Sequence, residues 1–323
     1  MVKFLSILVI CTTSLTAAPL GIMVPAYFYP TISNYWSQLD YAAARVPLIA
    51  ILNPDSGPGS SIDPNFVTVV TNLHKAGGKL IAYVATGYTT SNITSKVEFS
   101  INRYLGYYTV DGFFLDEMAN GASSNDVDYY ATLYQYIKAT NANFSVTGNP
   151  GTTTEESYLT QPTADMLMTY EDEATNYPGY VASTWVTNHL ARQFIHVSYG
   201  VTNATEMSNY VALAASRNAG WIFFTDDNLP NPYDTLPPYW TNEVLYVQSL
   251  NAAEPSTRLA VTGVTNHIPT LKVSGAPGAY EIQTTSNLSS WTALPLFNTP
   301  TGTGTVSDAT ATNRPASFYR TMQ

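Results

Sequence analysis

The sequence predicts an α/β protein that consists of a (β/α)8 barrel followed by a small all-β, sandwich-like module. Three observations lead to this prediction. Short apolar runs alternate eight times with amphipathic segments between Gly21 and Asn251. No glycine-rich phosphate loop follows the first run, as it would in a doubly wound sheet, and helical periodicity ends after Ala253. We therefore expect a barrel domain over residues 19–253 and an accessory β module over residues 257–323.

The eight apolar runs supply the expected barrel strands. They are rich in Val, Ile, Phe and Tyr and carry few charges before their last residues, which is typical of strands covered on both faces. In chain order, the runs are Met23–Tyr29, Leu48–Asn53, Lys79–Ala85, Val110–Glu117, Phe144–Asn149, Asp165–Glu171, Arg192–Tyr199 and Trp221–Asp227.

Amphipathic segments between these runs predict helices. Asp63-Pro64 places a capping residue and a proline at a helix start, apolar residues follow on one face, and Gly77-Gly78 ends the pattern. Residues 126–139 and 205–219 repeat the arrangement. Eight strand–helix units of this length fit a closed parallel barrel better than an open sheet.

The last part of the chain has a different composition. Residues 257–323 are rich in Thr, Gly and Pro and contain alternating runs such as Ala279–Thr284 and Ser317–Met322. This pattern indicates a small β-sandwich. It leaves open whether the module serves adhesion or sorting, or is only a spacer.

The first 18 residues have the three parts of a secretory signal peptide. Met1-Val2-Lys3 is a short basic start, Phe4–Cys11 is an apolar run too short to span a bilayer, and Thr16-Ala17-Ala18 is a small-residue cleavage site. The alternative is a buried N-terminal strand. From this pattern we expect a secreted protein, extracellular or attached to the cell surface through its C-terminal module. Because the only cysteine lies in the signal peptide, we expect no disulfides.

The charge of the chain restricts its partners. The formal net charge is −10, and nucleic acids and anionic membranes both require a basic patch on the protein. No run after the first segment is apolar for long enough to form a transmembrane helix. We therefore expect neither a nucleic-acid nor a membrane partner. An acidic surface is compatible with a neutral or cationic polymer such as a polysaccharide, and we expect a monomer.

Acidic residues gather where the predicted strands end. Asp116 and Glu117 end the fourth run, Glu171 ends the sixth, and Asp226 and Asp227 end the eighth. In (β/α)8 barrels the active site lies at the carboxyl ends of the strands. Cleavage of a glycosidic bond requires an ionised carboxylate near the anomeric carbon and a protonated one for the departing oxygen. The sequence therefore predicts a glycosidase in which Asp116, Glu117 and Glu171 are catalytic.

Two of these assignments depend on the local backbone. Because Asp116 and Glu117 are adjacent, strand alternation directs them to opposite sides unless the chain bends there. Asp226 and Asp227 are as consistent with helix capping as with sugar binding.

Other hydrolase chemistries lack the residues they need. His196 lies inside an apolar run and is expected in the core, and no two histidines have metal-ligand spacing, so we expect no metal and no cofactor. No Gly-x-Ser-x-Gly elbow is present, which argues against a serine hydrolase. Two alternatives remain: a non-catalytic polysaccharide-binding or coat protein on the same barrel, and a barrel deacetylase, which would need a metal site.

Several motifs resemble the spherulin-4-like (spherulation-specific) family, from about Gly21 to about Leu250. The motifs are Val24–Pro30, Asn53–Gly59, Val110–Glu117, Gly148–Gly151, Tyr170–Glu171 and Thr225–Trp240. The resemblance implies a (β/α)8 barrel and an endo-acting glycoside hydrolase, since characterised fungal members cut α-1,4-linked N-acetylgalactosamine in galactosaminogalactan. It does not fix the sugar for this chain.

The resemblance also implies roles for individual residues. The family's essential acids are an Asp-Glu pair ending the fourth strand and a Glu ending the sixth, which fall on Asp116, Glu117 and Glu171. We expect Asp116 to act as nucleophile or charge stabiliser, or to orient an acetamido group if the substrate assists. Glu171 is expected to be the general acid/base and Glu117 a positioning or second acidic group. The residues expected to bind substrate or line the cleft are Tyr27, Asn53, Asn149, Asp226, Asp227 and Tyr233.

Overall fold

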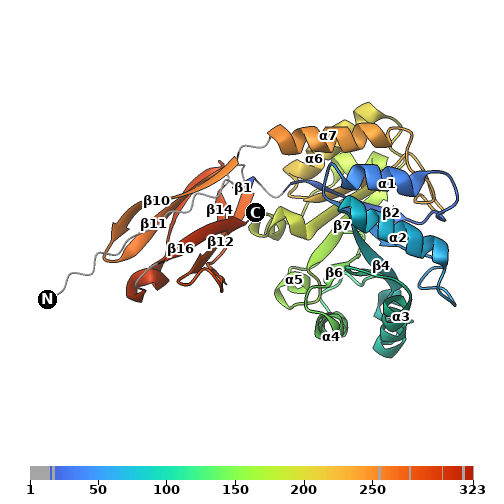
Figure 1. Ribbon diagram of the computed structural model, residues 1–323, viewed down its shortest axis with the longest axis horizontal. Helices are drawn as coiled ribbons and strands as arrows, with labels where there is room; N and C mark the ends of the chain where they lie inside the picture. The colour runs from blue at the N-terminus through green and yellow to red at the C-terminus, as the bar shows by residue number, and fades with distance from the viewer. Residues whose placement is uncertain are drawn as a thin grey trace. The chain divides into compact units, whose positions relative to one another are not determined.

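Eight parallel strands close into a barrel in the computed structural model (Figure 1). Each strand pairs with the next along the chain, and β9 returns to β2, which closes the ring. The strands are β2 (Gly21–Ala26), β3 (Leu48–Leu52), β4 (Lys79–Ala85), β5 (Gly112–Asp116), β6 (Ser145–Gly148), β7 (Met166–Glu173), β8 (Phe194–Tyr199) and β9 (Trp221–Phe224). Every predicted run overlaps one of them, so the predicted barrel is confirmed.

The structure describes residues 15–16, 19–253, 256–275, 278–299, 301–314 and 317–322. The predicted signal peptide lies outside these ranges except for Leu15–Thr16, which form the short strand β1. The chain divides into two compact units. One contains Leu20–Val186 and Arg192–Leu250, and the other contains Met1–Pro19, Thr187–Ala191 and Asn251–Gln323.

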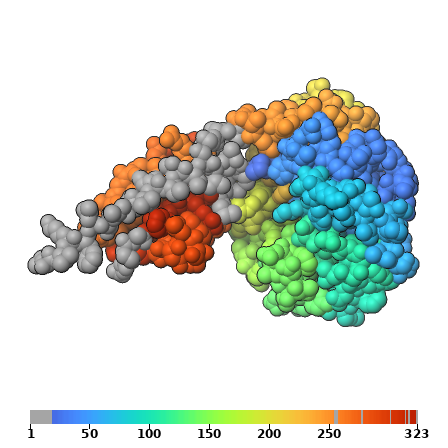
Figure 2. Space-filling view, viewed as in Figure 1, coloured from blue at the N-terminus to red at the C-terminus, as the bar shows by residue number. Residues whose placement is uncertain are grey.

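Helices cover the outside of the barrel. They are α1 (Tyr35–Ala43), α2 (Pro64–Ala76), α3 (Thr94–Tyr107), α4 (Ser124–Thr140), α5 (Ser157–Thr160), α6 (Ala204–Ser216) and α7 (Trp240–Ala253). The first and last of them lie side by side, as Figure 2 shows, and the Trp240 Nε1 donates to the Gln38 carbonyl at 3.3 Å. In the described part of the chain, no helix is long and apolar enough to cross a membrane.

The ends of α2 show how the local sequence determines a helix. Asp63 caps the helix, because its Oδ1 accepts the backbone N–H of Asn65 at 2.8 Å, and Pro64 occupies the first helical position. Gly77 ends the helix with a φ of 95°, a conformation that glycine adopts without strain. The capping and termination signals of the sequence therefore produce the helix they predict.

One crossover departs from the regular alternation. The described residues between β7 and β8 form no α-helix and instead make three 3-10 turns, η2 (Ala174–Gly179), η3 (Thr184–Asn188) and η4 (Ala191–Gln193). Pro178 lies inside η2, and the segment is rich in Thr and Asn, which favour turns over helix.

The second unit is built from antiparallel strands, as predicted. They are β10 (Ser256–Thr265), β11 (Ile268–Ser274), β12 (Gly278–Thr285), β13 (Thr292–Ala293), β14 (Phe297–Thr299), β15 (Thr303–Ser307) and β16 (Phe318–Met322). One sheet has the order β1-β10-β11-β15, and in the other β12 pairs with β13, β14 and β16. Buried residues such as Leu271, Val273, Tyr280 and Ile282 form its core.

Candidate active site

A single amide group joins two of the predicted acids at the carboxyl end of the barrel. Asp116 ends β5, Asn149 follows β6, and Glu171 lies on β7. The Asn149 Nδ2 donates to the Asp116 Oδ1 and to the Glu171 Oε2, at 2.7 Å in each case. The two carboxylate oxygens therefore lie no more than twice this distance apart.

The backbone of the neighbouring strands fixes the orientation of this amide. Asn149 is 6% exposed, and its N–H donates to the Leu115 carbonyl while its own carbonyl accepts from the Met118 N–H. Its side-chain Oδ1 accepts the backbone N–H of Gly151 at 2.9 Å. Because the oxygen of the amide is used there, the NH2 group must face the acids. Asn149 therefore orients both carboxylates.

The surroundings of Glu171 favour its protonated form. Burial raises the pKa of this carboxyl, and the negative charge of Asp116 raises it further. Hydrogen bonds from Tyr233 and Asn149 lower the pKa in part, the Tyr233 hydroxyl donating to the Glu171 Oε1 at 2.6 Å. Within the described residues, no lysine or arginine forms an ion pair with Glu171 or Asp116. Glu171 is therefore suited to hold a proton and to release it.

An irregularity in β7 turns Glu171 toward the barrel mouth. The register with β8 shifts between Met168 and Tyr170. Tyr170 packs against Tyr177, with ring centroids 4.6 Å apart, and the next side chain lies on the opposite side of the strand. Nothing in the local sequence indicates this register shift.

Tyrosine rings surround the acids. Tyr27 meets Tyr83 and Tyr233 edge to face, at centroid distances of 5.8 and 5.7 Å. Tyr83 forms a side-chain hydrogen bond with Asp116, and burial together with the charge of Asp116 raises the pKa values of Tyr27 and Tyr83. The tyrosine hydroxyls therefore remain protonated. Tyr27 and Tyr233 were predicted to line the cleft, whereas Tyr83 was missed, because inside an apolar run it has the sequence pattern of a core residue.

The backbone bends directly after Asp116. Glu117 has a φ of 54°, and its Oε2 accepts the backbone N–H of Gly87 at 3.1 Å. Its carbonyl accepts from the N–H of Tyr88 at 2.7 Å and from the Thr86 hydroxyl at 2.9 Å. Glu117 therefore faces the loop after β4, and Asp116 faces Asn149.

Three other predicted substrate-binding residues hold loops at the mouth. The Asn53 Oδ1 accepts the N–H of Gly57 at 2.8 Å, which closes the turn after β3. Asp227 accepts from the N–H of Asn228 at 2.9 Å and from the Thr235 hydroxyl at 3.2 Å, in the loop that carries Tyr233. Asp226 is half-buried, and burial raises its pKa. None of the three is hydrogen-bonded to Asp116, Asn149 or Glu171.

His196 lies in the core, as its place in an apolar run predicts. It is fully buried, its Nδ1 lies 2.8 Å from the Tyr177 hydroxyl, and burial lowers its pKa to about 3. The ring is therefore neutral at physiological pH. In the part of the chain that the structure describes, no group of three or more His, Cys, Asp or Glu residues could hold a metal ion.

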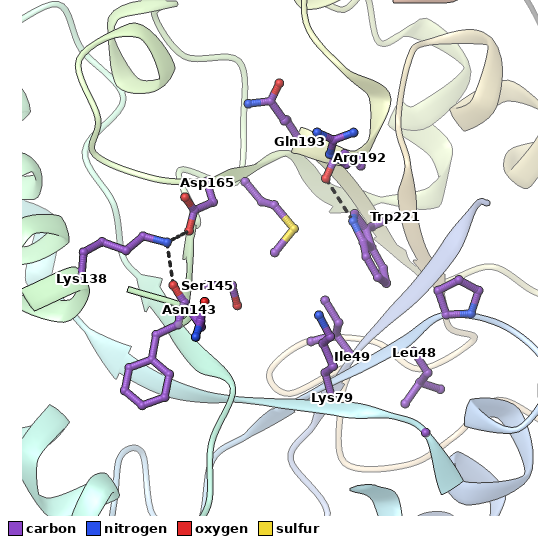
Figure 3. Close-up of a pocket in the computed structure, with 14 residues that line it drawn as sticks. Leu48, Ile49, Lys79, Lys138, Asn143, Ser145, Asp165, Arg192, Gln193 and Trp221 are labelled. Carbon is purple, nitrogen blue, oxygen red and sulfur yellow. Dashed lines mark hydrogen bonds and ion pairs between the residues drawn. The ribbon is translucent and has the colours of Figure 1, made fainter. Parts of the chain in front are cut away.

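A hollow of about 440 Å³ lies at the opposite end of the barrel, among the residues that begin the strands (Figure 3). Its walls are mostly apolar and include Ile49, Met166 and Trp221. Its one carboxylate, that of Asp165, accepts the Lys138 ammonium at 2.7 Å and the backbone N–H of Val146 at 2.8 Å. The hollow therefore contains a single carboxylate, and this carboxylate is paired with a lysine.

Comparison with known proteins relates the barrel to one family. Residues 21–247 match the model of spherulation-specific family 4. Spherulin-4 of Physarum polycephalum is 29% identical over 252 residues, which are 74% of this chain and 73% of that protein. The crystal structure of Aspergillus clavatus Sph3 in complex with GalNAc is similar with a TM-score of 0.63 and 23% identity, over 71% of this chain and 98% of that one.

Proposed function

This chain belongs to spherulation-specific family 4, and from that premise we propose that it is a glycoside hydrolase acting on an amino-sugar polysaccharide. One observation carries the proposal: the carboxylates of Asp116 and Glu171 converge on the Asn149 amide, without a neighbouring cation, at the mouth of the barrel. The GalNAc bound to Sph3 supports an amino sugar as the substrate class.

The geometry supports a division of labour between the two acids. Glu171, whose pKa is raised by burial and by Asp116, donates its proton to the glycosidic oxygen as the bond from this oxygen to the anomeric carbon breaks. Asp116 stabilises the positive charge that develops on the carbon, either by bonding to it or by orienting the acetamido group that does so. Glu171, now ionised, then takes a proton from water as the water oxygen bonds to the same carbon and the bond from this carbon to Asp116, or to the acetamido oxygen, breaks.

The spacing of the acids favours retention of configuration. Retaining enzymes place the two carboxyl groups about 5–5.5 Å apart, and inverting enzymes about 6.5–9.5 Å, to admit a water molecule. The Asp116 Oδ1 and the Glu171 Oε2, each 2.7 Å from one nitrogen, lie at most twice that distance apart, which supports the shorter spacing. We therefore assign a retaining mechanism.

The finer assignments follow the family. We propose an endo-acting, secreted, monomeric enzyme that cuts α-1,4-linked N-acetylgalactosamine in galactosaminogalactan-like chains. Glu117, turned toward the β4 loop, contributes as a positioning or second acidic group.

A glycan panel tests this proposal. The protein is incubated with galactosaminogalactan, chitin, and neutral α- and β-glucans, and mass spectrometry detects the oligosaccharides released. We expect internal cleavage of the amino-sugar chain, with NMR showing that the first-formed products retain the anomeric configuration. Binding without release of any oligosaccharide would instead support a non-catalytic polysaccharide-binding or coat protein.

A further inference from the structure

We infer that the substrate chain crosses the barrel mouth from Tyr88 to Tyr199, and that these two tyrosines bind sugar rings on opposite sides of the bond to be cleaved. The inference rests on the proposed function and deepens it, because it names residues that bind the polymer beyond the reacting sugar. Neither tyrosine was among the residues predicted to bind substrate.

Tyr88 presents an aromatic ring to solvent beside the acids. It lies in the loop after β4 and is 57% exposed, so most of its ring is open to a ligand, and the backbone beside it is bound to Glu117. Its pKa is raised by burial and by the charges of Asp116, Glu117 and Glu171. The ring therefore lies within electrostatic reach of all three acids while much of its surface stays open.

The loop that carries Tyr88 is held rigidly. The N–H groups of Gly87 and Tyr88 both donate to Glu117, and the Thr86 hydroxyl donates to the Asp116 carbonyl at 2.8 Å. Tyr88 has a φ of 53°, which is uncommon for a bulky residue and persists only where the surroundings impose it. A ring fixed in this way loses little conformational freedom when a sugar stacks on it.

Tyr199 lies on the other side of the acids. It ends β8 and is half-buried. Its pKa is raised by burial and then by Asp172, Glu173 and Glu171, whereas that of Tyr88 responds to Asp116 and Glu117. The Cα of Tyr199 pairs with that of Glu173 across β7 and β8, so Tyr199 lies beyond Glu171 when the barrel is followed from β4.

The topology of the barrel gives these positions a direction. In a closed ring of eight strands, β4 and β8 are four strands apart in either direction and therefore lie opposite each other. The strands β5, β6 and β7, which carry Asp116, Asn149 and Glu171, lie along one side between them. A chain that runs from Tyr88 to Tyr199 along this side of the mouth passes the acids, with sugar units bound before and after the cleaved bond. Such an arrangement suits cleavage within a polymer.

The test compares kinetic constants of the full-length protein on galactosaminogalactan oligosaccharides. We expect Tyr88→Ala and Tyr199→Leu each to raise KM by about tenfold and to lower kcat much less, since stacking acts on the ground and transition states alike. Because the two rings lie on opposite sides, the double variant should raise KM by about the product of the two factors. Tyr88→Phe keeps the ring and should resemble the wild type.

Phe99→Ala provides the matched control. Phe99 is 60% exposed, much like Tyr88, but it lies on the outer helix α3, so its removal should leave KM unchanged. Melting temperatures of all variants confirm folding. Binding of the same oligosaccharides to each variant in a Glu171→Gln background, measured by calorimetry, should show the same tenfold losses.

The possible failures can be told apart. An unchanged KM in Tyr88→Ala or Tyr199→Leu, with the wild type active, overturns the proposed path and leaves the proposed function standing. Equal losses in Tyr88→Phe and Tyr88→Ala overturn stacking as its basis. If the wild type neither binds nor cleaves the oligosaccharides, the proposed function fails, and this inference fails with it.

Discussion

The two ends of the barrel carry similar acids in opposite surroundings. Asp111 directly precedes β5, and Asp116 ends it. Asp165 directly precedes β7, and Glu171 lies near its end. At the amino end, Asp165 accepts the Lys138 ammonium (Figure 3), and Asp111 accepts the Leu80 N–H at 2.7 Å and lies 2.8 Å from the His74 Nε2. At the carboxyl end, Asp116 and Glu171 receive neutral donors.

This difference distinguishes acids that stabilise the fold from acids that can take part in the reaction. A carboxylate bound by an ammonium and a backbone N–H is stabilised in its charged form. Glu171 has only an amide and a tyrosine hydroxyl as donors, and burial together with the charge of Asp116 raises its pKa, which favours the protonated form that a general acid needs. All four residues are carboxylic acids beside the end of a strand, so their neighbours determine which of them can take part in the reaction.

Among substitutions that remove a single contact, we expect the largest fall in kcat from loss of the Asn149 amide, which joins Asp116 and Glu171. In Asn149→Ala, the two carboxylates lose their shared donor and their fixed spacing. A misplacement of about 1 Å can cost about 100-fold in rate, so we expect kcat to fall by about this factor. Asn102→Ala, at an exposed amide on α3 that pairs with Tyr136, should leave kcat unchanged. Equal kcat values for the two variants would show that Asn149 does not orient the acids.

At the amino end, the corresponding change should affect stability alone. Asp165→Asn leaves Lys138 without its counter-charge, and we expect the free energy of unfolding to fall by about 1–2 kcal/mol, a value reduced because both side chains are partly exposed. Urea denaturation measures the loss, and kcat of the folded protein should not change. A lower kcat in the folded variant would mean that this end contributes to the reaction.

Another carboxylate, that of Glu243, is buried but lies outside the predicted site. Glu243 on α7 is fully buried, its Oε1 accepts the N–H of Phe224, and burial raises its pKa to about 8. The stability that the neutral acid provides is complete below the pKa of the unfolded chain, near 4.5, and is lost as the pH rises toward 8. The change in unfolding free energy caused by Glu243→Gln should therefore be more stabilising at pH 8 than at pH 4, and the two changes should differ by about 1–3 kcal/mol. An equal effect at both pH values would contradict this.

The smallest expected effect is a shift in a pH profile. In Tyr233→Phe, Glu171 loses a hydrogen bond that lowers its pKa, so this pKa rises. The acid then keeps its proton to higher pH, and the alkaline limb of kcat/KM should move upward. Tyr134→Phe, which removes a hydroxyl bound to Asp165 at the amino end, should leave the profile unchanged. A downward shift in Tyr233→Phe would exclude Glu171 as the general acid.

The barrel was predictable because its signals are local. Apolar runs, the Asp63-Pro64 start and the Gly77 end are each readable within a few residues. The predicted acids reach one rim because parallel strands place their carboxyl ends together.

The contacts within the site were less predictable, because they depend on pairings between strands. The register shift before Tyr170 and the bend at Glu117 arise from neighbours that are distant in sequence. Asn149 was predicted to bind sugar, which stays a prediction, and its contacts with both acids and with Gly151 become visible only once the strands are paired. Tyr88 follows a single glycine in a loop, and nothing in that stretch distinguishes a sugar-binding ring from any exposed tyrosine.

The most direct test of the account is the rate at which Glu171→Gln releases reducing ends from galactosaminogalactan, measured beside its melting temperature. The substitution keeps the size of the side chain and removes the acidic proton, and the amide oxygen that it introduces can still accept from one of the two donors, Asn149 and Tyr233. We predict a rate at least about 1,000-fold below that of the wild type, at an undiminished melting temperature. A folded Glu171→Gln protein with near-normal turnover would contradict the account.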